Sequence, residues 1–394
     1  MAGTSRVKLY ARGLSEAGVS TGILVVRGTE RAGQMRNEDV RGEHEGICFE
    51  YTGGRTVIPR SWIGRRLDEA IGIMQAARRL RLMKHEGLEY ALLYTNDLRF
   101  IKIFSMMCRQ VHIKVVLELC EWPLAKATYL GLNIKTARRF MVEGMPCVDA
   151  VLPISNFLKN QIEEYEYAHD CHIPHLQVPI MVDTISFQPL QSRPGGRPSI
   201  LWCGSLDYTL ITKNIVDAAC LLRSRGNVNF EIRILGGIGP PDQLRKLQAY
   251  VARTFAADVV RIFGFLPEGE LRQAYADAAA CLVLLQDNDI SRSRFPTKLG
   301  EFLAMGRPVI ASPIGELPGY LLDQETAYFT RNLSAEALAD TIEKVLNDRE
   351  RAEQVGGAGR RLAEDVFDYR NQGRRVAAFL EGMQESHLVR GIRK

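Results

Sequence analysis

The sequence lacks any run of the roughly 18–20 consecutive apolar residues that a membrane-spanning helix needs, and no secretory signal peptide is visible in it. It also lacks a CxxC pair, although it contains eight cysteines. Scattered cysteines argue against a disulfide framework and against a metal site, and they favour a reducing compartment. We therefore expect a cytoplasmic protein without a metal site.

A strong excess of one charge is also missing, because 51 Lys and Arg residues face 46 Asp and Glu residues. A dedicated nucleic-acid binder would carry a clustered basic footprint, so no nucleic-acid partner is expected. The longest basic stretch, 78–84, shares an apparent helix with apolar residues. We interpret it as a solvated helix face, with contact to anionic lipid headgroups as the alternative. The second interpretation would place the protein peripherally on the inner face of a membrane.

Apolar runs typical of buried parallel strands alternate with helix-period segments along the whole chain. Such alternation predicts an α/β protein with open, doubly wound sheets, and 394 residues exceed what one hydrophobic core usually serves. The stretch 188–198 is rich in Pro and Gly, and a fresh βα series follows it. We therefore predict two domains, 1–188 and 199–367, followed by a terminal helix-period stretch that begins at Asp368.

The first domain lacks its expected first strand. Residues 5–17 have the pattern of a helix, with Thr4 or Ser5 as its cap and Gly18 as its end. Only 1–3 precede this helix, whereas a doubly wound domain begins with a strand that lies centrally in its sheet. Without that strand its neighbours would stand about 9–10 Å apart, too far to pair. Either the true start lies upstream, or the first sheet is rearranged.

The most informative segment runs from Arg294 to Ser312 and predicts a loop, a short helix, a turn and a strand. Pro296 closes the loop, and Thr297 can cap the helix. The free backbone N–H groups of Thr297, Lys298 and Leu299 would point outward at the positive end of the helix, which suits a diphosphate. Glu301 lies on the same side as Lys298 by its i, i+3 spacing and could accept hydrogen bonds from a ribose diol. The alternative is an ordinary surface glutamate.

This segment resembles the donor site of retaining GT-B glycosyltransferases of family GT4. The resemblance rests on Glu301 in a short helix, the turn 305–308 and the strand 309–312, and it extends to the blocks 199–205, 232–240 and 260–266. It implies the GT-B fold, in which two doubly wound, Rossmann-like domains face a cleft. The first domain would bind the acceptor and the second the nucleotide-sugar donor, with the helix 368–394 packing back on the first.

The resemblance also assigns site residues. Lys213 and Glu301 would be catalytic, with Lys213 binding the diphosphate. The acceptor side retains Gly3 from a glycine-rich loop. At a strand end where the family often has a His, Glu121 or Glu118 could face the acceptor, with ordinary loop carboxylates as the alternative. Ser293 stands where the family has a Glu that holds sugar hydroxyls, and the Arg usual near Ser205 is absent. The donor-binding residues implied are Gly204, Ser205, Gly237, Phe265, Leu266, Ser293, Pro296, Thr297, Lys298 and Leu299.

The implied activity is transfer of a sugar from a UDP- or GDP-sugar to a hydroxyl of a glycan or lipid-linked acceptor, with retention of configuration. No cofactor and no metal ion are implied, since Lys213, Lys298 and the helix N-terminus would stabilise the leaving diphosphate. One alternative is a regulatory protein that binds a nucleotide sugar through a degenerate site, suggested by Ser293, Ser205 and the missing strand. A GT-B epimerase is the other, but it would need paired carboxylates or a His base.

Overall fold

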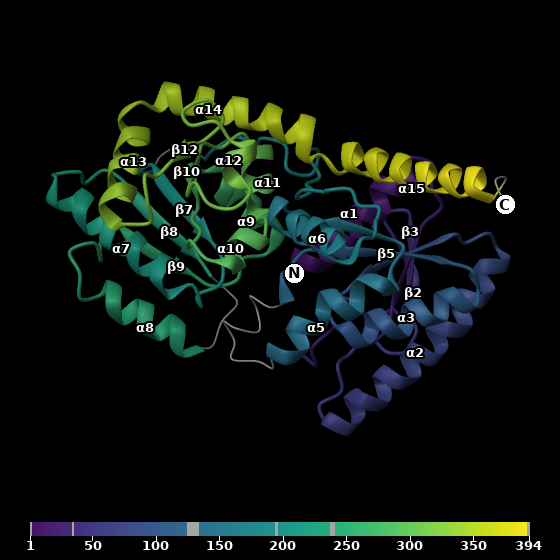
Figure 1. The fold of residues 1–394 in the computed structure, drawn as a ribbon. Helices are drawn as coiled ribbons and strands as arrows, with labels where there is room; N and C mark the ends of the chain where they lie inside the picture. The colour runs from purple at the N-terminus through teal and green to yellow at the C-terminus, as the bar shows by residue number, and fades with distance from the viewer. Residues whose placement is uncertain (1, 34, 124–133, 194–195, 237–240, 392–394) are drawn as a thin grey trace. The chain divides into compact units, whose positions relative to one another are not determined.

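The computed structural model describes residues 2–33, 35–123, 134–193, 196–236 and 241–391. The chain divides into two compact units (Figure 1). Unit 1 consists of Met1–Pro179 and Tyr369–Lys394, and unit 2 is Ile180–Asp368. Each unit contains the alternating helices and parallel strands predicted for an α/β protein, and each is described by itself below.

Unit 2 contains a six-stranded parallel sheet in the order β12-β11-β10-β7-β8-β9. All six residues of β10 are buried, which explains its uninterrupted apolar sequence. The strands are β7 (Ser199–Cys203), β8 (Glu231–Leu235), β9 (Val260–Phe263), β10 (Ala278–Val283), β11 (Val309–Ala311) and β12 (Tyr328–Phe329).

The helices of unit 2 pack on this sheet and on each other. Contacts join α7 to α13 and α11 to α14, and the apolar core extends from the sheet into α7, α8 and α13. The helices are α7 (Thr209–Ser224), α8 (Pro241–Val251), α9 (Glu268–Ala276), α10 (Asp289–Ser293), α11 (Thr297–Ala304), α12 (Leu317–Tyr320), α13 (Ala335–Asn347) and α14 (Arg349–Leu362), the last followed by a π-helical turn at Ala363–Phe367.

The strand order of unit 2 reverses beside β7. This strand is followed along the chain by β8 and β9 on one side, while β10 returns to pair with its other edge. In open parallel sheets, ligands bind outside the carboxyl ends of the strands at such a switch point. The ends of β7 and β10 therefore mark the place where a ligand site is expected.

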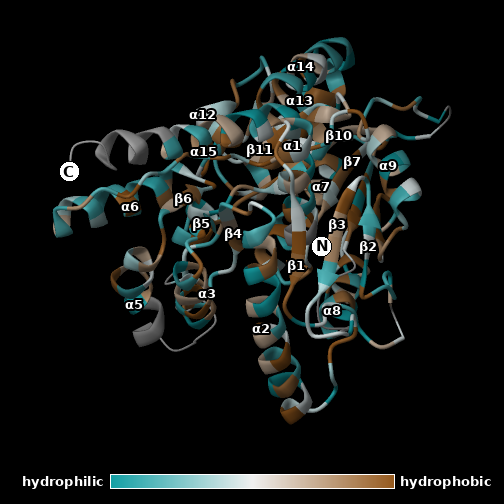
Figure 2. Cartoon of the chain, turned by 90° about the vertical axis from the view of Figure 1, so that its right-hand side faces the viewer, coloured by the Kyte–Doolittle hydropathy of each residue, from teal (hydrophilic) through white to brown (hydrophobic). Residues whose placement is uncertain are grey.

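Unit 1 contains two three-stranded sheets, β1-β3-β2 and β4-β5-β6. The pairs β1–β3, β4–β5 and β5–β6 are parallel, and β2–β3 is antiparallel. Figure 2 shows the strands across the unit in the order β6, β5, β4, β1, β3, β2. The strands are β1 (Gly22–Val25), β2 (Arg41–His44), β3 (Ile47–Tyr51), β4 (Tyr90–Tyr94), β5 (Lys114–Leu119) and β6 (Ala150–Pro153).

The two sheets of unit 1 are not joined by hydrogen bonds between β1 and β4. Within the part of the chain that the structure describes, each of these two strands pairs along one edge only. Their residues are mostly half-buried, whereas five of the six residues of β5 are buried. The described part of unit 1 thus contains two separate sheets where the sequence predicts one doubly wound sheet.

The first and the last helix of the chain pack against each other in unit 1. The backbones of α1 (Ala2–Glu16) and α15 (Tyr369–Gly391) touch at Gly13 and Gly373, where a Cβ on Gly373 would lie 2.5 Å from the Cα of Gly13. The predicted cap at Thr4 or Ser5 is wrong, because α1 already begins at Ala2. Packing holds this end of α1 instead, since Arg6 is buried in it and paired with Glu118 at 2.5 Å.

The remaining helices of unit 1 follow the strands in βα order. Each of the first two begins at a side-chain cap, which is Ser61 for α2 and Asp97 for α3. These helices are α2 (Trp62–His85), α3 (Leu98–Gln110), α5 (Ile134–Gly144) and α6 (Asn156–His169), with a 3₁₀ turn at Met145–Cys147.

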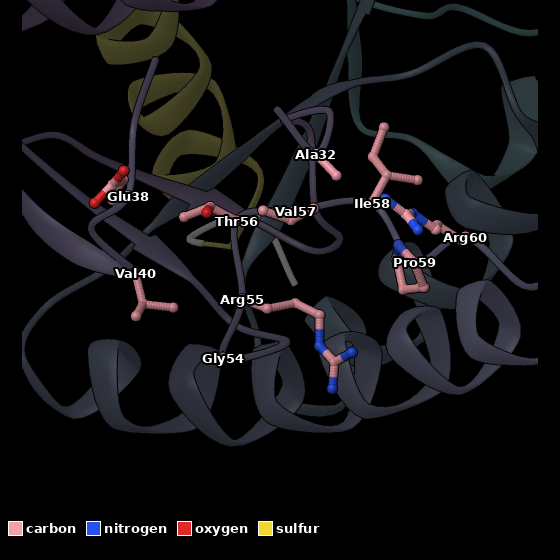
Figure 3. A pocket seen from close by; sticks show the side chains of 10 residues that line it. All are labelled: Ala32, Glu38, Val40, Gly54, Arg55, Thr56, Val57, Ile58, Pro59 and Arg60. Carbon is pink, nitrogen blue, oxygen red and sulfur yellow. The ribbon is translucent and has the colours of Figure 1, made fainter. Parts of the chain in front are cut away.

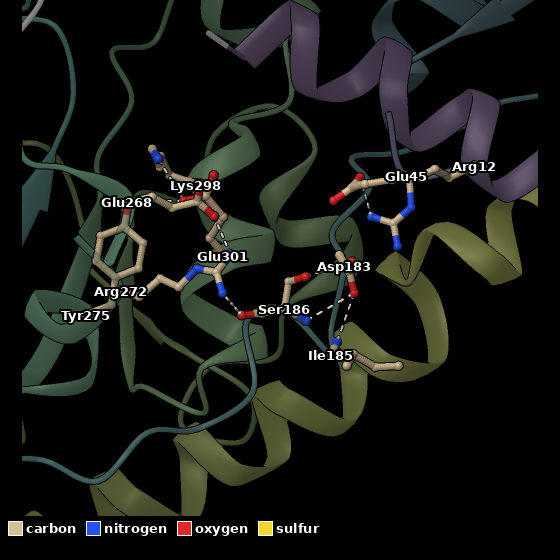
Figure 4. Close-up of polar contacts among 10 residues, drawn as sticks. All are labelled: Arg12, Glu45, Asp183, Ile185, Ser186, Glu268, Arg272, Tyr275, Lys298 and Glu301. Carbon is tan, nitrogen blue, oxygen red and sulfur yellow. Dashed lines mark hydrogen bonds and ion pairs between the residues drawn. The ribbon is translucent and has the colours of Figure 1, made fainter. Parts of the chain in front are cut away.

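The units divide at Pro179 and Ile180, not in the stretch 188–198. The segment 180–188 belongs to unit 2 because its backbone is bonded there. The N–H of Val182 donates to the carbonyl of Phe367 at 2.9 Å, and Arg272 donates to the carbonyl of Ser186 at 2.8 Å (Figure 4). The first predicted boundary therefore lies about nine residues too late.

Candidate functional site

Helix α11 begins where the sequence predicts, beside the switch point of unit 2. Pro296 precedes it with extended backbone, and the N–H of Leu299 donates to the carbonyl of Pro296 at 3.1 Å. Leu299, Phe302 and Leu303 are buried and hold the helix on the sheet, and Gly306 ends it with a φ of +66°. The first amides, on Thr297 and Lys298, have no acceptor within the helix. This end of α11 therefore carries the partial positive charge that attracts an anion.

A carboxylate and an ammonium group meet one turn into this helix. The Nζ of Lys298 donates to Oε2 of Glu301 at 2.7 Å, and the phenol of Tyr275 donates to the same oxygen at 3.0 Å (Figure 4). Both helix side chains remain partly exposed, whereas Tyr275 is buried. Among the described residues no partner is found for Oε1 of Glu301, so this oxygen can accept further hydrogen bonds.

The surroundings fix the protonation states of these groups. Burial, followed by the nearby Glu301 carboxylate, raises the pKa of Tyr275 far above its usual range, so Tyr275 stays a neutral donor. Burial alone would lower the pKa of Lys298, but Glu301 outweighs it and the pKa rises above 10.5. Burial raises the pKa of the Cys203 thiol, whose Sγ lies 3.8 Å from the phenol oxygen. The site thus holds one ammonium, one carboxylate and two neutral groups.

Sequence analysis missed Tyr275. This tyrosine lies on α9, which precedes β10, and it packs edge to face against Phe302 at 4.9 Å between ring centroids. An aromatic residue near the end of an amphipathic helix is usual in a core, so its type and position gave no signal. Only the folded structure brings it to Glu301.

Two glycines keep the backbone close at the ends of β7 and β8. The N–H of Gly204 donates to the carbonyl of Leu235 at 3.1 Å, and a Cβ there would lie 2.6 Å from the ring of Trp202. A Cβ on Gly236 would lie 2.5 Å from Leu206. Both positions therefore exclude a side chain in this arrangement. The predicted donor residue Gly237 lies outside the described residues.

Lys213 is not brought to Glu301 in this structure. It lies on an exposed face of α7, and its Nζ stands 5.5 Å from the ring centroid of Tyr250 on α8. The hydroxyl of Ser205 donates to the carboxylate of Asp207 at 3.0 Å. The sequence predicted Ser205 as a donor-binding residue but gave no role to Asp207, which adds negative charge next to it.

The remaining predicted donor residues lie on two loops of unit 2. Phe265 follows β9 and is 65% exposed, and Leu266 beside it is half-buried. Ser293 ends α10 and is buried, with its hydroxyl donating to the carbonyl of Ile290 at 3.0 Å. The loop after β11 lies close to α10, since a Cβ on Gly315 would be 3.0 Å from the carbonyl oxygen of Ser291. Ser293 thus bonds to the backbone of its own short helix, whose Ser291 lies against that loop.

The two predicted acceptor residues lie in unit 1. Glu121 follows β5 and accepts a hydrogen bond from the amide of Asn96 at 3.1 Å. Gly3 lies in the first turn of α1, where the prediction expected a loop. The neighbouring carboxylate of Glu118 is buried against Arg6, whose guanidinium also donates to the carbonyls of Val178 and Pro179.

Chemically, the site in unit 2 combines a free carboxylate oxygen, a fixed cation and a helix N-terminus at the switch point of a parallel sheet. Such a set can bind a ligand that carries both a diol and an anionic group. No cluster of three or more His, Cys, Asp or Glu side chains able to hold a metal ion occurs among the residues described.

Comparison with known proteins agrees with this geometry. Residues 197–348 match the family described as glycosyl transferases group 1. The MMP alpha-(1->4)-mannosyltransferase of Mycolicibacterium hassiacum is 28% identical over 207 residues, which are 52% of this chain and 47% of that protein. The GDP-mannose-dependent alpha-(1-6)-phosphatidylinositol monomannoside mannosyltransferase of Mycolicibacterium smegmatis is 34% identical over 86 residues, 22% of each chain. The matches thus span less than half the length of these curated relatives.

The similarity of fold extends over nearly the whole chain. Sucrose-phosphate synthase from Thermosynechococcus elongatus superimposes with a TM-score of 0.72 over 96% of this chain and 93% of that chain, at 18% identity. At this identity the likeness concerns the fold. The predicted GT-B fold with two Rossmann-like domains is thereby confirmed.

Proposed function

We propose that this chain is a retaining hexosyltransferase of the GT4 type. It would transfer a sugar from a UDP- or GDP-sugar to a hydroxyl group of a glycan or lipid-linked acceptor. Residues 197–348 match the family of glycosyl transferases group 1, which supports the proposal. The observation that carries this proposal is the junction of Lys298, Glu301 and Tyr275 at the N-terminus of α11. A carboxylate that could accept hydrogen bonds from a diol, and a helix N-terminus that could bind an anion, then lie within one turn of each other.

In this proposal Oε1 of Glu301 accepts from the ribose hydroxyls, since Lys298 and Tyr275 already hold Oε2. The diphosphate lies at the amides of Thr297 and Lys298, and the lysine adds its charge. Lys213 would turn from Tyr250 to the phosphate when the donor binds, which its exposed position on α7 permits. No metal ion or other cofactor is called for.

Sugar transfer breaks the bond between the anomeric carbon and the diphosphate oxygen, and it forms a bond from that carbon to the acceptor oxygen. Negative charge grows on the departing diphosphate, where the fixed dipole of α11 and the two lysines stabilise it. The acceptor hydroxyl attacks on the face that the diphosphate leaves, and its proton passes to a diphosphate oxygen. Configuration is then retained without a nucleophile from the protein.

The acceptor would meet unit 1 near Glu121, at the carboxyl end of β5. A mannosyl donor is the first to test, because both relatives are named as mannosyltransferases. One of them is named for a phosphatidylinositol monomannoside acceptor, which favours a lipid-linked acceptor here. We also propose a cytoplasmic location with peripheral contact to a membrane. No helix in the described part of the chain is long and apolar enough to cross a membrane.

A regulatory protein that binds a nucleotide sugar without transferring it is the second candidate. Ser293 favours it, because this side chain is buried and bonded to Ile290 where the family carries a charged glutamate. Such a protein would share the Glu301 site and would lack turnover. The two candidates therefore predict the same binding and different chemistry.

The test is a panel of UDP-, GDP- and ADP-sugars scored by thermal shift and by nucleotide release. Glu301→Gln keeps the shape of the side chain but loses its charge, and it should weaken both signals about tenfold or more. Glu336→Gln on the exposed first turn of α13 is the matched control and should behave like the parent. Stabilisation without nucleotide release, with the acceptors tried, would favour the regulatory protein. A folded chain that no nucleotide sugar stabilises would contradict both candidates.

A further inference from the structure

Helix α2 in unit 1 presents an apolar face to solvent. Ile63, Leu67, Ile71 and Met74 recur at helical spacing, and their exposed fractions lie between 40% and 65%. The opposite face is buried and includes Gly72, where a Cβ would lie 2.9 Å from the carbonyl carbon of Val26. A surface helix ordinarily carries polar residues on its outer face, so this arrangement needs a partner.

We refer to Ile63, Leu67, Ile71 and Met74 as the apolar stripe. Trp62 extends it at the start of the helix and is also exposed. The stripe covers three turns, and the exposed positions that continue it toward the end of the helix are mostly basic, beginning with Arg78 and Arg81. The outer face of α2 thus changes from apolar to cationic along its length.

The exposed charged side chains of α2 itself are all positive. Arg65, Arg66, Arg78 and Arg81 are exposed on α2. The two carboxylates of the helix are withdrawn, because Asp68 is buried and accepts from the N–H of Gly28 at 3.1 Å, and Glu69 is half-buried beside Arg66 and Arg27. A partner for this face must therefore offer apolar volume and negative charge together.

A hollow of about 620 Å³ opens next to the first residue of α2 (Figure 3). Ile58, Pro59 and Arg60 line it on the side toward the helix, and Glu38 lies across from them. Within the described ranges, the guanidinium of Arg60 has no hydrogen-bond or ion-pair partner. The hollow thus adds a free cation and apolar lining at the end of the helix where the stripe begins.

We propose that α2 is a membrane-docking helix, whose apolar stripe enters the interface of an anionic lipid bilayer while the surrounding arginines bind headgroup phosphates. Lasting attachment to a bilayer needs both apolar insertion and a basic patch, and α2 supplies both. A second copy of this chain is a poorer occupant, because a two-fold contact along α2 would set its arginines against each other. The proposal does not depend on sugar transfer.

The sequence pointed only to the basic end of this helix, residues 78–84. The structure moves the expected contact to Trp62 and the apolar stripe, because these side chains are exposed on the folded unit. Ala76 and Leu80, which are equally apolar in sequence, are buried in unit 1. Exposure therefore separates the docking face from the core face.

The experiment is flotation of the full chain with vesicles of phosphatidylcholine, with and without phosphatidylglycerol. The parent should float with the anionic vesicles and should be released by salt. Ile63→Asp combined with Leu67→Asp should weaken binding by more than about tenfold, since both side chains lose their insertion. Arg78→Gln combined with Arg81→Gln should weaken it about fivefold for each charge removed.

Phe255→Asp is the matched control, because Phe255 is 88% exposed in unit 2 and lies outside this surface. It should bind vesicles like the parent. All variants should keep the parent melting temperature and the parent thermal shift with nucleotide sugars. The proposal fails if the parent does not bind anionic vesicles or if the double aspartate variant binds as well as the parent. It also fails if light scattering shows a parent dimer that this variant dissociates, since a second copy would then cover the stripe.

Discussion

The phenol of Tyr275 donates a 3.0 Å hydrogen bond to Oε2 of Glu301, although the two residues lie on different helices and 26 positions apart. The same oxygen accepts from Lys298, so the carboxylate is fixed by two donors. The free oxygen of Glu301 therefore points in a direction set by α9 and α11 together. In the proposed site, the carboxylate that would bind the donor is thus held by a tyrosine that no motif indicated.

Tyr275→Phe should weaken binding of the nucleotide sugar and lower the free energy of unfolding by about 1 kcal/mol, since one buried hydrogen bond is lost. The benzene ring of the variant can still pack against Phe302. Isothermal titration and urea unfolding measure the two effects. Tyr167→Phe is the control, because Tyr167 on α6 is almost fully exposed and should tolerate the change. Unchanged donor affinity in Tyr275→Phe would show that the hydroxyl of Tyr275 does not support donor binding.

Lys298→Met should weaken binding of the donor diphosphate about tenfold or more, because the variant loses a fixed positive charge at the anion site. The pKa of Lys298 is raised in the folded state, so its ion pair with Glu301 contributes stability fully below the unfolded value of 10.5. That contribution is lost as pH rises through the higher folded pKa. The difference in unfolding free energy between parent and variant should thus stay constant from about neutral pH to about pH 10 and shrink above it. A difference that grows with rising pH would contradict this assignment.

Gly204→Ala should destabilise unit 2 by about 1–3 kcal/mol, since the new methyl group would lie 2.6 Å from the ring of Trp202. The ring is buried and cannot move freely. Gly264→Ala is the matched control at the end of β9 in the same sheet, because no atom would lie within 4 Å of its Cβ. Thermal melts of both variants decide the prediction. Equal melting temperatures would show that Trp202 can give way.

Apolar runs in the sequence coincide with several parallel strands. Ala150–Pro153 and Ser199–Cys203 are such runs, and most of their residues are buried, as is typical of parallel strands covered on both faces. The hairpin of β2 and β3 was missed. All four residues of β2 are exposed, so they carry no alternating pattern. The turn at Glu45 and Gly46 has positive φ values at both residues, which a glutamate in the sequence does not indicate.

The candidate site likewise has features that the sequence predicted and features that it did not. The loop, helix and turn from Pro296 to Gly306 follow from local signals, since proline and glycine fix the ends of α11. The contact of Glu301 with Tyr275 depends on how side chains of separate segments meet. The position of Lys213 over Tyr250 depends on the packing of α7 beside α8. Spacing along the chain contains no measure of such contacts.

Gly373→Ala should destabilise unit 1 by about 1–3 kcal/mol or more, because its Cβ would press on the backbone of Gly13, which cannot rotate away. Gly382→Ala lies in the same helix, is exposed and meets no atom within 4 Å, so it should stabilise α15 by up to about 1 kcal/mol. Opposite shifts in melting temperature are therefore expected from the same chemical change. A neutral Gly373→Ala would mean that α1 and α15 do not pack this closely.

Ser293→Glu tests whether a glutamate at this position, at the end of α10, improves binding of a nucleotide sugar. Ser293 is buried and bonded to Ile290, so a carboxylate there would either lose water or force α10 open. We expect the variant to unfold at a lower temperature than the parent and to gain no affinity for nucleotide sugars. Ser291→Glu on the same short helix, which is only half-buried, should be tolerated better. A Ser293→Glu variant with tighter donor binding would show that this loop can reopen toward the sugar, and the regulatory interpretation would lose its main support.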